Sequence, residues 1–257
     1  MARLTAITRL PSRSLGDCEL THLERLPIDI DRALEQHAAY RAMLEACGAR
    51  VETLPPLDDS PDGTFVEDVA LVLDEVAVLC SMGAESRRAE VPAIASALSP
   101  FRPLRSVELP GRIDGGDVQR VGRVILVGLS GRTDAAGIDA LREIVTPFGY
   151  TVRGIVVDGC LHFKSACTVL PDGRLLINPA WVDRGEFAGF DTVDIDPSEP
   201  WAADVLTLGR IVVMGAPHPG TRAILEAEDL EVRVVDLSEF AKAEAGVTCL
   251  SLVFETE

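Results

Sequence analysis

The sequence predicts an α/β fold in which five ββαβ units close into a ring, a pseudo-symmetric five-bladed propeller around a central channel. The first observation is a recurring order of strand, turn, strand and helix, with a further strand before the next unit starts. The second is the spacing of the starts, at residues 68, 117, 165, 204 and 249, because repeats of about 40–50 residues are typical of propellers. Similarity between the units is weak, so an ordinary alternating α/β sheet is the alternative.

The N-terminal part of the chain predicts the first strand and the clearest helix. We expect a strand at residues 4–9 and a long connection at residues 11–27, a length typical of a functional flap or of a disordered loop. Apolar side chains recur on one face of residues 29–47, which predicts a helix that Gly48 ends. A second strand is expected at residues 50–54.

The repeated units predict the remaining elements. Second strands are expected at residues 76–80, 124–127, 175–177 and 211–214, and helices at residues 89–98, 134–146 and 221–228. Near the C-terminus we expect a short helix over residues 238–245 with Ser238 as its N-cap, and a strand over residues 246–252. This fifth unit lacks a second half, so we expect the N-terminal strand and helix to complete it.

A closed ring would bring the first residues of the five units together, and most of these residues are chemically active. They are Asp68, Asp117, Ser165, Asp204 and Cys249. Cysteine is one of the most buried residue types, so Cys249 beside Leu250 and Leu252 is either a small core residue or a nucleophile. The convergence of polar residues at the same place favours the nucleophile.

Length and charge limit the classes of function. The 257 residues are enough for one large domain or two small ones, and a single ring assigns residues 1–257 to one domain. The net charge of −17 argues against a nucleic acid or an anionic membrane as a partner, since both need a basic surface. The longest apolar run, residues 69–80, is interrupted by Asp74 and Glu75, and the N-terminus lacks the pattern of a signal peptide. We therefore expect a cytoplasmic protein.

The cysteines and histidines offer few catalytic candidates. Six scattered cysteines without a CxxC pair predict reduced thiols. His162 stands at the start of the third unit, as Cys249 does in the fifth, whereas we expect His37 to be a packing residue and His218 a surface or packing residue. A metal site built from residues 160, 162 and 167 is conceivable, but the spacing fits no closed zinc pattern.

Acidic pairs stand at two of the unit starts. Glu67 and Asp68 precede one predicted strand, and Asp114 and Asp117 flank a Gly-Gly turn before another. These acids could simply shape turns or be solvated. Acids gathered in a central cleft are costly unless they meet a cation, and a guanidinium fork suits paired carboxylates.

Six motifs, in order and spanning nearly the whole chain, resemble the dimethylarginine dimethylaminohydrolase family. They are residues 62–68 (DGTFVED), 86–88 (SRR), 114–118 (DGGDV), 128–133 (GLSGRT), 158–165 (DGCLHFKS) and 246–249 (GVTC). The resemblance implies the five-bladed pentein fold of enzymes that modify guanidino groups, in agreement with the repeat count. It also implies a hydrolase with a cysteine nucleophile.

The resemblance implies three catalytic roles. Cys249 corresponds to the nucleophile, His162 to the general acid and base, and Asp114 to the carboxylate that orients the histidine. Some members of the family have Glu at this last position, so the shorter Asp114 is expected to alter the geometry slightly. The mechanism implied is a covalent S-alkylthiouronium on the cysteine that water then hydrolyses.

The resemblance also implies the groups that bind a guanidino amino acid. Asp68 and Glu67 correspond to residues that grip the guanidinium, and Asp62 corresponds to the group that meets the α-amino nitrogen. Arg87 and Arg132 correspond to the pair that clamps the α-carboxylate.

Two further positions correspond to backbone contacts. Leu20, in the long early loop, matches a flap residue that contacts substrate through its main chain, and Ala243 matches a position that offers a carbonyl. Glu244, at the rim of the pocket, departs from the family motif.

The expected activity is hydrolysis of Nω-methylated arginines to citrulline and dimethylamine or methylamine, without a metal or an organic cofactor. Alternatives within the superfamily are an arginine deiminase and an amidinotransferase, although a carboxylate clamp argues against agmatine. A non-catalytic binding protein on the same fold, such as a ribosome-associated factor, is the alternative from another class. The joint presence of Cys249, His162 and Asp114 argues against it, as does the negative charge. A monomer and a homodimer are both compatible with the sequence.

Overall fold

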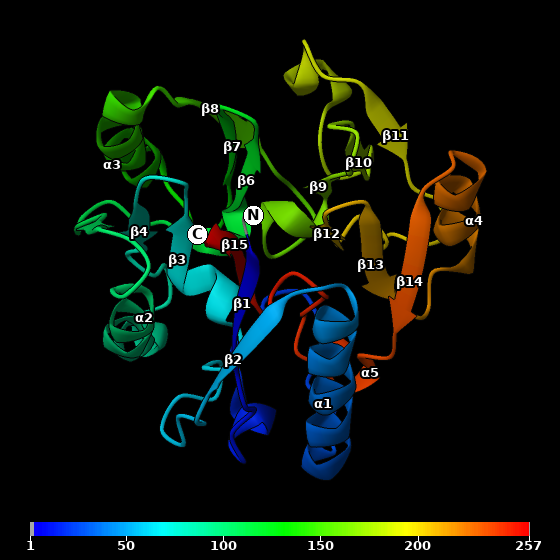
Figure 1. The fold of residues 1–257 in the computed structure, drawn as a ribbon, viewed down its shortest axis with the longest axis horizontal. Coiled ribbons are helices and arrows are strands. Elements are labelled where there is room, and N and C mark those ends of the chain that lie inside the picture. The colour runs from blue at the N-terminus through cyan, green and yellow to red at the C-terminus, as the bar shows by residue number, and fades with distance from the viewer. Residues whose placement is uncertain (1–2, 257) are drawn as a thin grey trace.

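Five small sheets surround the centre of the molecule (Figure 1). In this computed structural model, residues 3–256 are described. Every sheet has three strands, of which the first is antiparallel to the second and the second is parallel to the third. We call each sheet with its helix a blade. This fivefold repetition confirms the predicted α/β propeller and excludes a single alternating sheet.

The strands follow the predicted order. They are β3 (Ala70–Val72), β4 (Ala77–Leu79) and β5 (Leu104–Ser106); β6 (Val118–Val121), β7 (Val124–Leu129) and β8 (Thr151–Val156); β9 (Cys167–Val169), β10 (Leu175–Ile177) and β11 (Thr192–Asp194); β12 (Val205–Leu208), β13 (Ile211–Gly215) and β14 (Glu231–Val235); and β15 (Leu252–Thr256), β1 (Arg3–Arg9) and β2 (Arg50–Leu54). The last blade joins the two ends of the chain, as predicted, since Ile7 of β1 pairs with Leu252 of β15.

The helices lie outside the ring of sheets (Figure 1). They are α1 (Ile30–Ala46), α2 (Val91–Leu98), α3 (Ala135–Val145), α4 (Pro219–Ala227) and the short α5 (Ser238–Ala241). Short 3₁₀ helices are η1 (Leu15–Asp17), η2 (Val66–Val69), η3 (Glu85–Glu90), η4 (Gly115–Asp117), η5 (Thr146–Phe148), η6 (Phe163–Ser165) and η7 (Arg184–Phe187). In the third blade η7 takes the place that an α-helix has in the others.

Capping explains why the predicted bounds of α1 and α3 are accurate, whereas the helix predicted over residues 238–245 ends early, at Ala241. The side chain of Asp29 accepts a hydrogen bond from the backbone of Arg32 at the start of α1, and Gly48, with φ of +91°, follows its end. Asp134 caps α3 in the same way, by accepting from Gly137. The helix predicted at residues 221–228 begins earlier, at Pro219, because proline is well suited to the first turn.

The prediction of a strand over residues 246–252 is wrong. The strand β15 begins only at Leu252, and Cys249 lies in the turn before it. Backbone groups of this segment bond to side chains and to another blade instead of to a strand partner, as when the carbonyl of Val247 accepts from the Tyr40 hydroxyl at 2.8 Å. Ser238 is also the first residue of α5 and not its N-cap; its hydroxyl accepts from Gln36.

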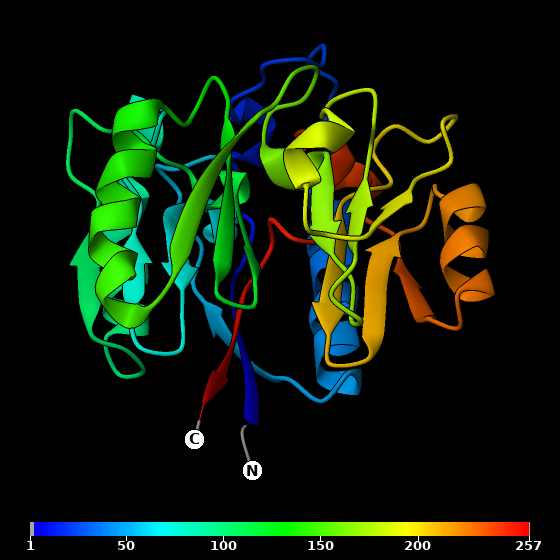
Figure 2. The ribbon, with the colours of Figure 1, turned by 90° about the horizontal axis from the view of Figure 1, so that it is seen from above.

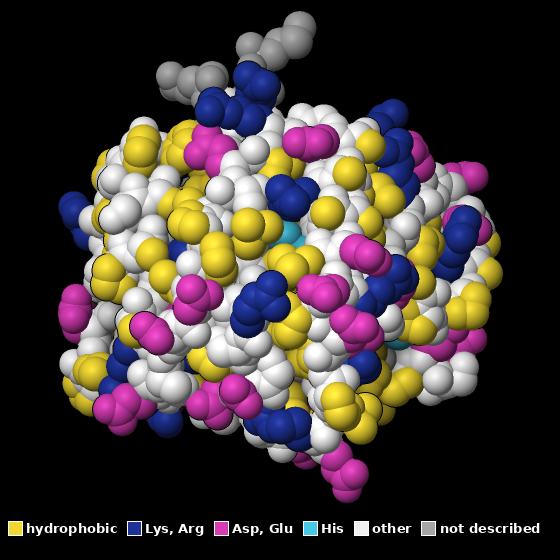
Figure 3. Space-filling view, turned by 90° about the horizontal axis from the view of Figure 1, so that it is seen from below, with side chains coloured by type: hydrophobic (Ala, Val, Ile, Leu, Met, Phe, Trp, Pro, Cys, Tyr) yellow, Lys and Arg dark blue, Asp and Glu magenta, His cyan; other side chains and the backbone are white. Residues whose placement is uncertain are grey.

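The hydrophobic core is mainly aliphatic, and many polar and charged side chains are also buried. His37 is fully buried, which confirms it as a packing residue, and burial lowers its pKa to about 3, so the ring is neutral. All six cysteines are free thiols, as predicted. Within residues 3–256 no helix is long and apolar enough to cross a membrane. Figure 3 shows one face of the surface, on which basic and acidic side chains are interspersed with apolar ones.

Candidate active site

The starts of the blades are tied to one another by side chains, which closes the ring. Asp68 accepts a hydrogen bond from the backbone of Gly116 in the next blade at 3.1 Å, and Asp117 accepts from the backbone of Phe163 at 2.9 Å. Asp204 accepts from the backbone of Thr248 at 3.1 Å.

Two further bonds complete the circle. Thr168 donates to the carbonyl of Ala203 at 2.6 Å, and the backbone of Glu67 donates to the carbonyl of Cys249 at 3.3 Å. The predicted convergence of the five starts is therefore confirmed. It places a thiol, an imidazole and several carboxylates at one end of the channel.

A glycine pair allows the closest of these approaches. A Cβ atom on Gly116 would lie 2.5 Å from Asp68 Oδ1 and 2.7 Å from His162 Nδ1. On Gly115 it would lie 2.1 Å from the carbonyl oxygen of Glu67. A side chain at Gly116 would therefore displace His162 or Asp68, and one at Gly115 would displace the backbone of Glu67.

His162 is held between two carboxylates. Its Nε2 lies 3.1 Å from Asp114 Oδ2, and its Nδ1 lies 3.6 Å from Asp68 Oδ1. Burial opposes protonation of the imidazole, but the charge of Asp68 and the hydrogen bond to Asp114 outweigh it and raise the pKa of His162 to about 9. The free protein therefore holds an imidazolium at neutral pH, the form that can donate a proton.

Cys249 is buried in an acidic environment. Burial, followed by the charges of Asp204, Asp68 and Glu67, raises the pKa of its thiol well above the ordinary value. Without substrate the sulfur is therefore a thiol and not a thiolate. A cation placed beside these carboxylates would reverse the electrostatic effect and favour the thiolate.

Arg87 is saturated by groups of the protein. Its Nη1 lies 2.5 Å from Asp68 Oδ2, and its Nε and Nη2 donate to Glu90 at 3.1 and 2.9 Å. The whole side chain is buried, so these bonds fix the orientation of Asp68. The contact predicted between Arg87 and a substrate carboxylate stays a prediction, and it competes with these partners.

Arg132 is more available to a ligand. Its Nη1 lies 3.5 Å from Asp114 Oδ2 but forms no hydrogen bond to any residue from 3 to 256. It lines the same small cavity as Cys249. An anionic group entering that cavity would satisfy the guanidinium.

The cavity that contains Cys249 is narrow, with about 10 Å³ of free volume. It is lined by Glu19, Asp62, Phe65, Asp68, Arg87, Arg132, Leu161, His162, Ala243, Glu244, Ala245 and Cys249. A space near the size of one water molecule cannot hold an amino acid. Substrate can therefore enter only if part of the lining moves.

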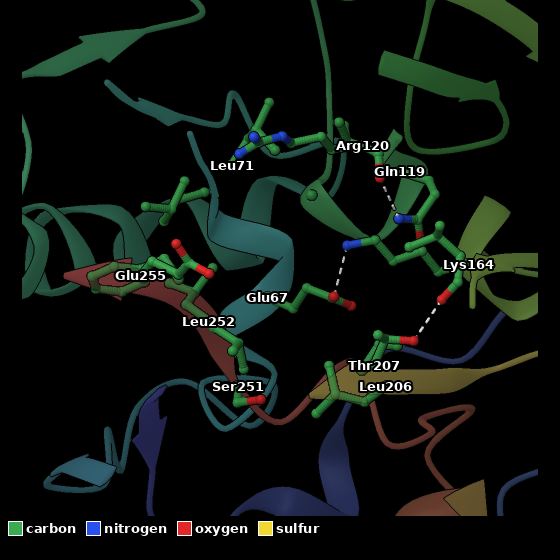
Figure 4. A pocket seen from close by; sticks show the side chains of 18 of the residues that line it. Glu67, Leu71, Gln119, Arg120, Lys164, Leu206, Thr207, Ser251, Leu252 and Glu255 are labelled. Carbon is green, nitrogen blue, oxygen red and sulfur yellow. Dashed lines mark hydrogen bonds and ion pairs between the residues drawn. The ribbon is translucent and has the colours of Figure 1, made fainter. Parts of the chain in front are cut away.

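A second and larger cavity, of about 510 Å³, lies at the other side of the same turns (Figure 4). Glu67 and Lys164 point toward each other there and form an ion pair at 2.6 Å. Glu67 thus faces this rear cavity while its neighbour Asp68 lines the front one. The ion pair explains how a buried Glu67 is tolerated, although burial still raises the pKa of its carboxyl group.

The long early loop, residues 18–26, covers the front cavity and is called the flap below. It follows β1 on the side of the molecule opposite to the two termini (Figure 2). The backbone of Glu19 donates to Asp62 at 3.1 Å, and Leu20 packs against the apolar cluster that contains Ala243 and Cys249. The structure thus favours the flap over a disordered loop.

No family model matches the sequence. Individual proteins, however, match it over nearly the whole length. The N(G),N(G)-dimethylarginine dimethylaminohydrolase of Streptomyces coelicolor is 41% identical over 249 residues, which cover 96% of this chain and 95% of that protein. The protein of the same name from Pseudomonas aeruginosa is 35% identical, with 96% and 98% covered.

The chain belongs to the dimethylarginine dimethylaminohydrolase family. A crystal structure of the Pseudomonas aeruginosa enzyme in complex with citrulline has the same fold, with a TM-score of 0.93 at 34% identity over 99% of this chain and all of that one. Family membership and the structural match confirm the resemblance and the pentein fold.

Within this family fold, seven of the ten predicted site residues line the front cavity. They are Asp62, Asp68, Arg87, Arg132, His162, Ala243 and Cys249. Asp114 lies behind His162, and Glu67 faces the rear cavity. Leu20 does not line the front cavity itself, but its neighbour Glu19 does.

Three residues of the site were not predicted. Glu90 pairs with Arg87, Lys164 pairs with Glu67, and Glu244 binds the flap. The spacing of Arg87 and Glu90, three residues apart in a helical turn, could have indicated their pairing. For the other two, the sequence separation from their partners leaves no local signal. Among residues 3–256 no group of His, Cys, Asp or Glu is placed to hold a metal ion.

Proposed function

We propose that this protein hydrolyses Nω-methylated arginines to citrulline and dimethylamine or methylamine, with Cys249 as the nucleophile. The observation that carries the proposal is the meeting of Cys249 and His162 in one small, acidic cavity, with Asp114 Oδ2 3.1 Å from the imidazole Nε2. Named dimethylarginine dimethylaminohydrolases at 41% and 35% identity support the reaction class.

Substrate recognition follows from the charges in the cavity. The guanidinium of the substrate meets Asp68, whose second oxygen is fixed by Arg87, and the α-ammonium meets Asp62. The guanidinium of Arg132, whose Nη1 forms no hydrogen bond within residues 3–256, takes the α-carboxylate. Burial raises the pKa of Asp62, so its carboxylate form also benefits from a cationic partner.

The first half of the reaction forms a covalent intermediate. The cationic substrate lowers the pKa of Cys249, and the thiol proton leaves to solvent. The thiolate then attacks the central guanidinium carbon to form a C–S bond. The imidazolium of His162 gives its proton to the methylated nitrogen, the C–N bond breaks, and the amine departs. An S-alkylthiouronium remains on Cys249.

In the second half of the reaction the same histidine acts as a general base instead of a general acid. Neutral His162 takes a proton from a water molecule whose oxygen attacks the thiouronium carbon. The tetrahedral adduct collapses, the C–S bond breaks, and Cys249 leaves as a thiolate that takes up the proton still carried by the former water oxygen and becomes a thiol again. Citrulline is released with the oxygen of that water, and His162 is again an imidazolium.

An assay for citrulline tests the proposal and separates the alternatives. The purified protein is offered asymmetric dimethylarginine, monomethylarginine and arginine in parallel. Citrulline from the methylated substrates, with little from arginine, is the expected result. Citrulline mainly from arginine would assign the protein to the deiminases, and transfer of the amidino group to an added amine would identify an amidinotransferase. No product with a reduced Cys249 would reject the substrate class.

A further inference from the structure

Two carboxylates hold the flap on either side of Leu20. The backbone of Glu19 donates to Asp62 at 3.1 Å. Immediately after Leu20, the backbone N–H groups of three successive residues, Thr21, His22 and Leu23, donate to Glu244 Oε1 at 3.0, 2.6 and 2.6 Å. The main chain of Leu20 is therefore fixed from both sides above the cavity.

The binding of Glu244 by the flap has the geometry of an anion site. Successive N–H groups that converge on one point form a concave nest for a negative charge. Hydrogen bonds from N–H groups to a carboxylate are stronger than neutral ones, and Glu244 Oε1 accepts three of them. No other side chain within residues 3–256 accepts from these three N–H groups.

Glu244 is held in an unusual position. Its backbone has φ of +57°, a left-handed conformation that disfavours residues with side chains, and its side chain is buried with only 7% of the residue exposed. It lies five residues before Cys249 and lines the same cavity. Its Oε2 accepts no hydrogen bond from the described part of the chain. The strained turn thus presents one buried carboxylate to the flap.

We propose that Glu244 is a positioning residue that latches the flap closed over Cys249 and so sets the place of the Leu20 main chain against the substrate. The flap covers the front cavity, so it opens to admit substrate, and the bonds to Glu244 re-form over the bound amino acid. Each catalytic cycle therefore breaks and re-forms the bonds between Glu244 and residues 21–23. The effect on kinetics rests on the proposed function, whereas the latch itself does not.

Two variants separate the carboxylate from the backbone strain. Glu244→Gly removes the carboxylate and supplies the residue best suited to a positive φ. Glu244→Gln keeps the length of the side chain and a neutral acceptor. Glu24→Gln is the matched control, because Glu24 is an exposed residue of the same flap.

The first readout is hydrogen exchange of the flap without substrate. We expect the amides of residues 21–23 to exchange about 10-fold faster in Glu244→Gly, less so in Glu244→Gln, and unchanged in Glu24→Gln. The thermal midpoint of Glu244→Gly should not fall, because the strain at this residue is relieved. A folded Glu244→Gly or Glu244→Gln protein whose flap amides exchange as slowly as in the wild type would overturn the latch.

The second readout is the division of the effect between kcat and KM. With dimethylarginine, Glu244→Gly should raise KM roughly 10-fold and change kcat less than about 3-fold, with Glu244→Gln between it and the wild type. An unchanged KM in a variant with a loosened flap would reject the role of the latch in substrate binding. If the protein makes no citrulline but the Glu244 substitutions still speed the exchange of the flap amides, the latch is supported and the proposed function is rejected. The two failures are therefore distinguishable.

Discussion

Replacing Asp114 with Asn tests whether the carboxylates around His162 set its protonation. The imidazole must be charged to donate a proton to the leaving amine, so activity should fall as pH rises through the pKa of His162, about 9. In Asp114→Asn the amide keeps the shape of the side chain but removes the charge. The alkaline limb of the profile should therefore move to lower pH.

The size of this effect can be worked from the site. The pKa of His162 rises from 6.5 to about 9 even though burial opposes protonation, which corresponds to roughly 3 kcal/mol in favour of the imidazolium. Asp68, Asp117 and Asp114 share this effect. Loss of one of the three charges should lower the pKa by about one unit.

The assay is kcat/KM against pH for wild type, Asp114→Asn and Asp114→Glu, since this ratio reports ionisation in the free enzyme. Asp114→Glu should keep the alkaline limb near its wild-type position. The exposed Asp59, changed to Asn, is the matched control. An alkaline limb in Asp114→Asn that coincides with the wild-type limb would refute the reasoning.

Three further predictions concern binding and stability. Arg132→Ala should raise KM for dimethylarginine about 10-fold with a smaller change in kcat, and an unchanged KM would remove Arg132 from the carboxylate contact. Glu90→Gln should lower the free energy of unfolding by about 1–3 kcal/mol in urea titrations, because the buried Arg87 loses an ionic partner. Because the folded-state pKa of His162 is raised, its contribution to stability should be complete below pH 6.5 and disappear as pH rises through 9. His162→Gln should flatten this decline, and an equal slope in both proteins would contradict the assignment.

The order of the blades was predictable because their spacing and patterning are local properties of the sequence. The boundaries of α1 and α3 follow from capping residues such as Asp29 and Asp134. The strand predicted across Cys249 failed for a tertiary reason. Its apolar residues favour a strand, but their backbone groups bind Tyr40, Asp204 and the blade that contains Glu67.

In the site, too, local motifs were predictable from the sequence and long-range contacts were not. The motifs named Cys249, His162 and Asp114, and the structure places the last two in hydrogen-bond contact. The bond between Glu244 and the flap joins residues more than 200 positions apart. It depends on a positive φ that no sequence pattern revealed, so only the folded chain shows it.

The most direct test of the central claim compares citrulline formation by the wild type and by Cys249→Ser. Binding of dimethylarginine is followed in both proteins by the rise in thermal midpoint, which shows that the variant is folded and binds substrate. The account predicts citrulline from the wild type and none from Cys249→Ser, with a similar thermal shift in both. Citrulline production by the serine variant at the wild-type rate would contradict the role of Cys249 as the nucleophile.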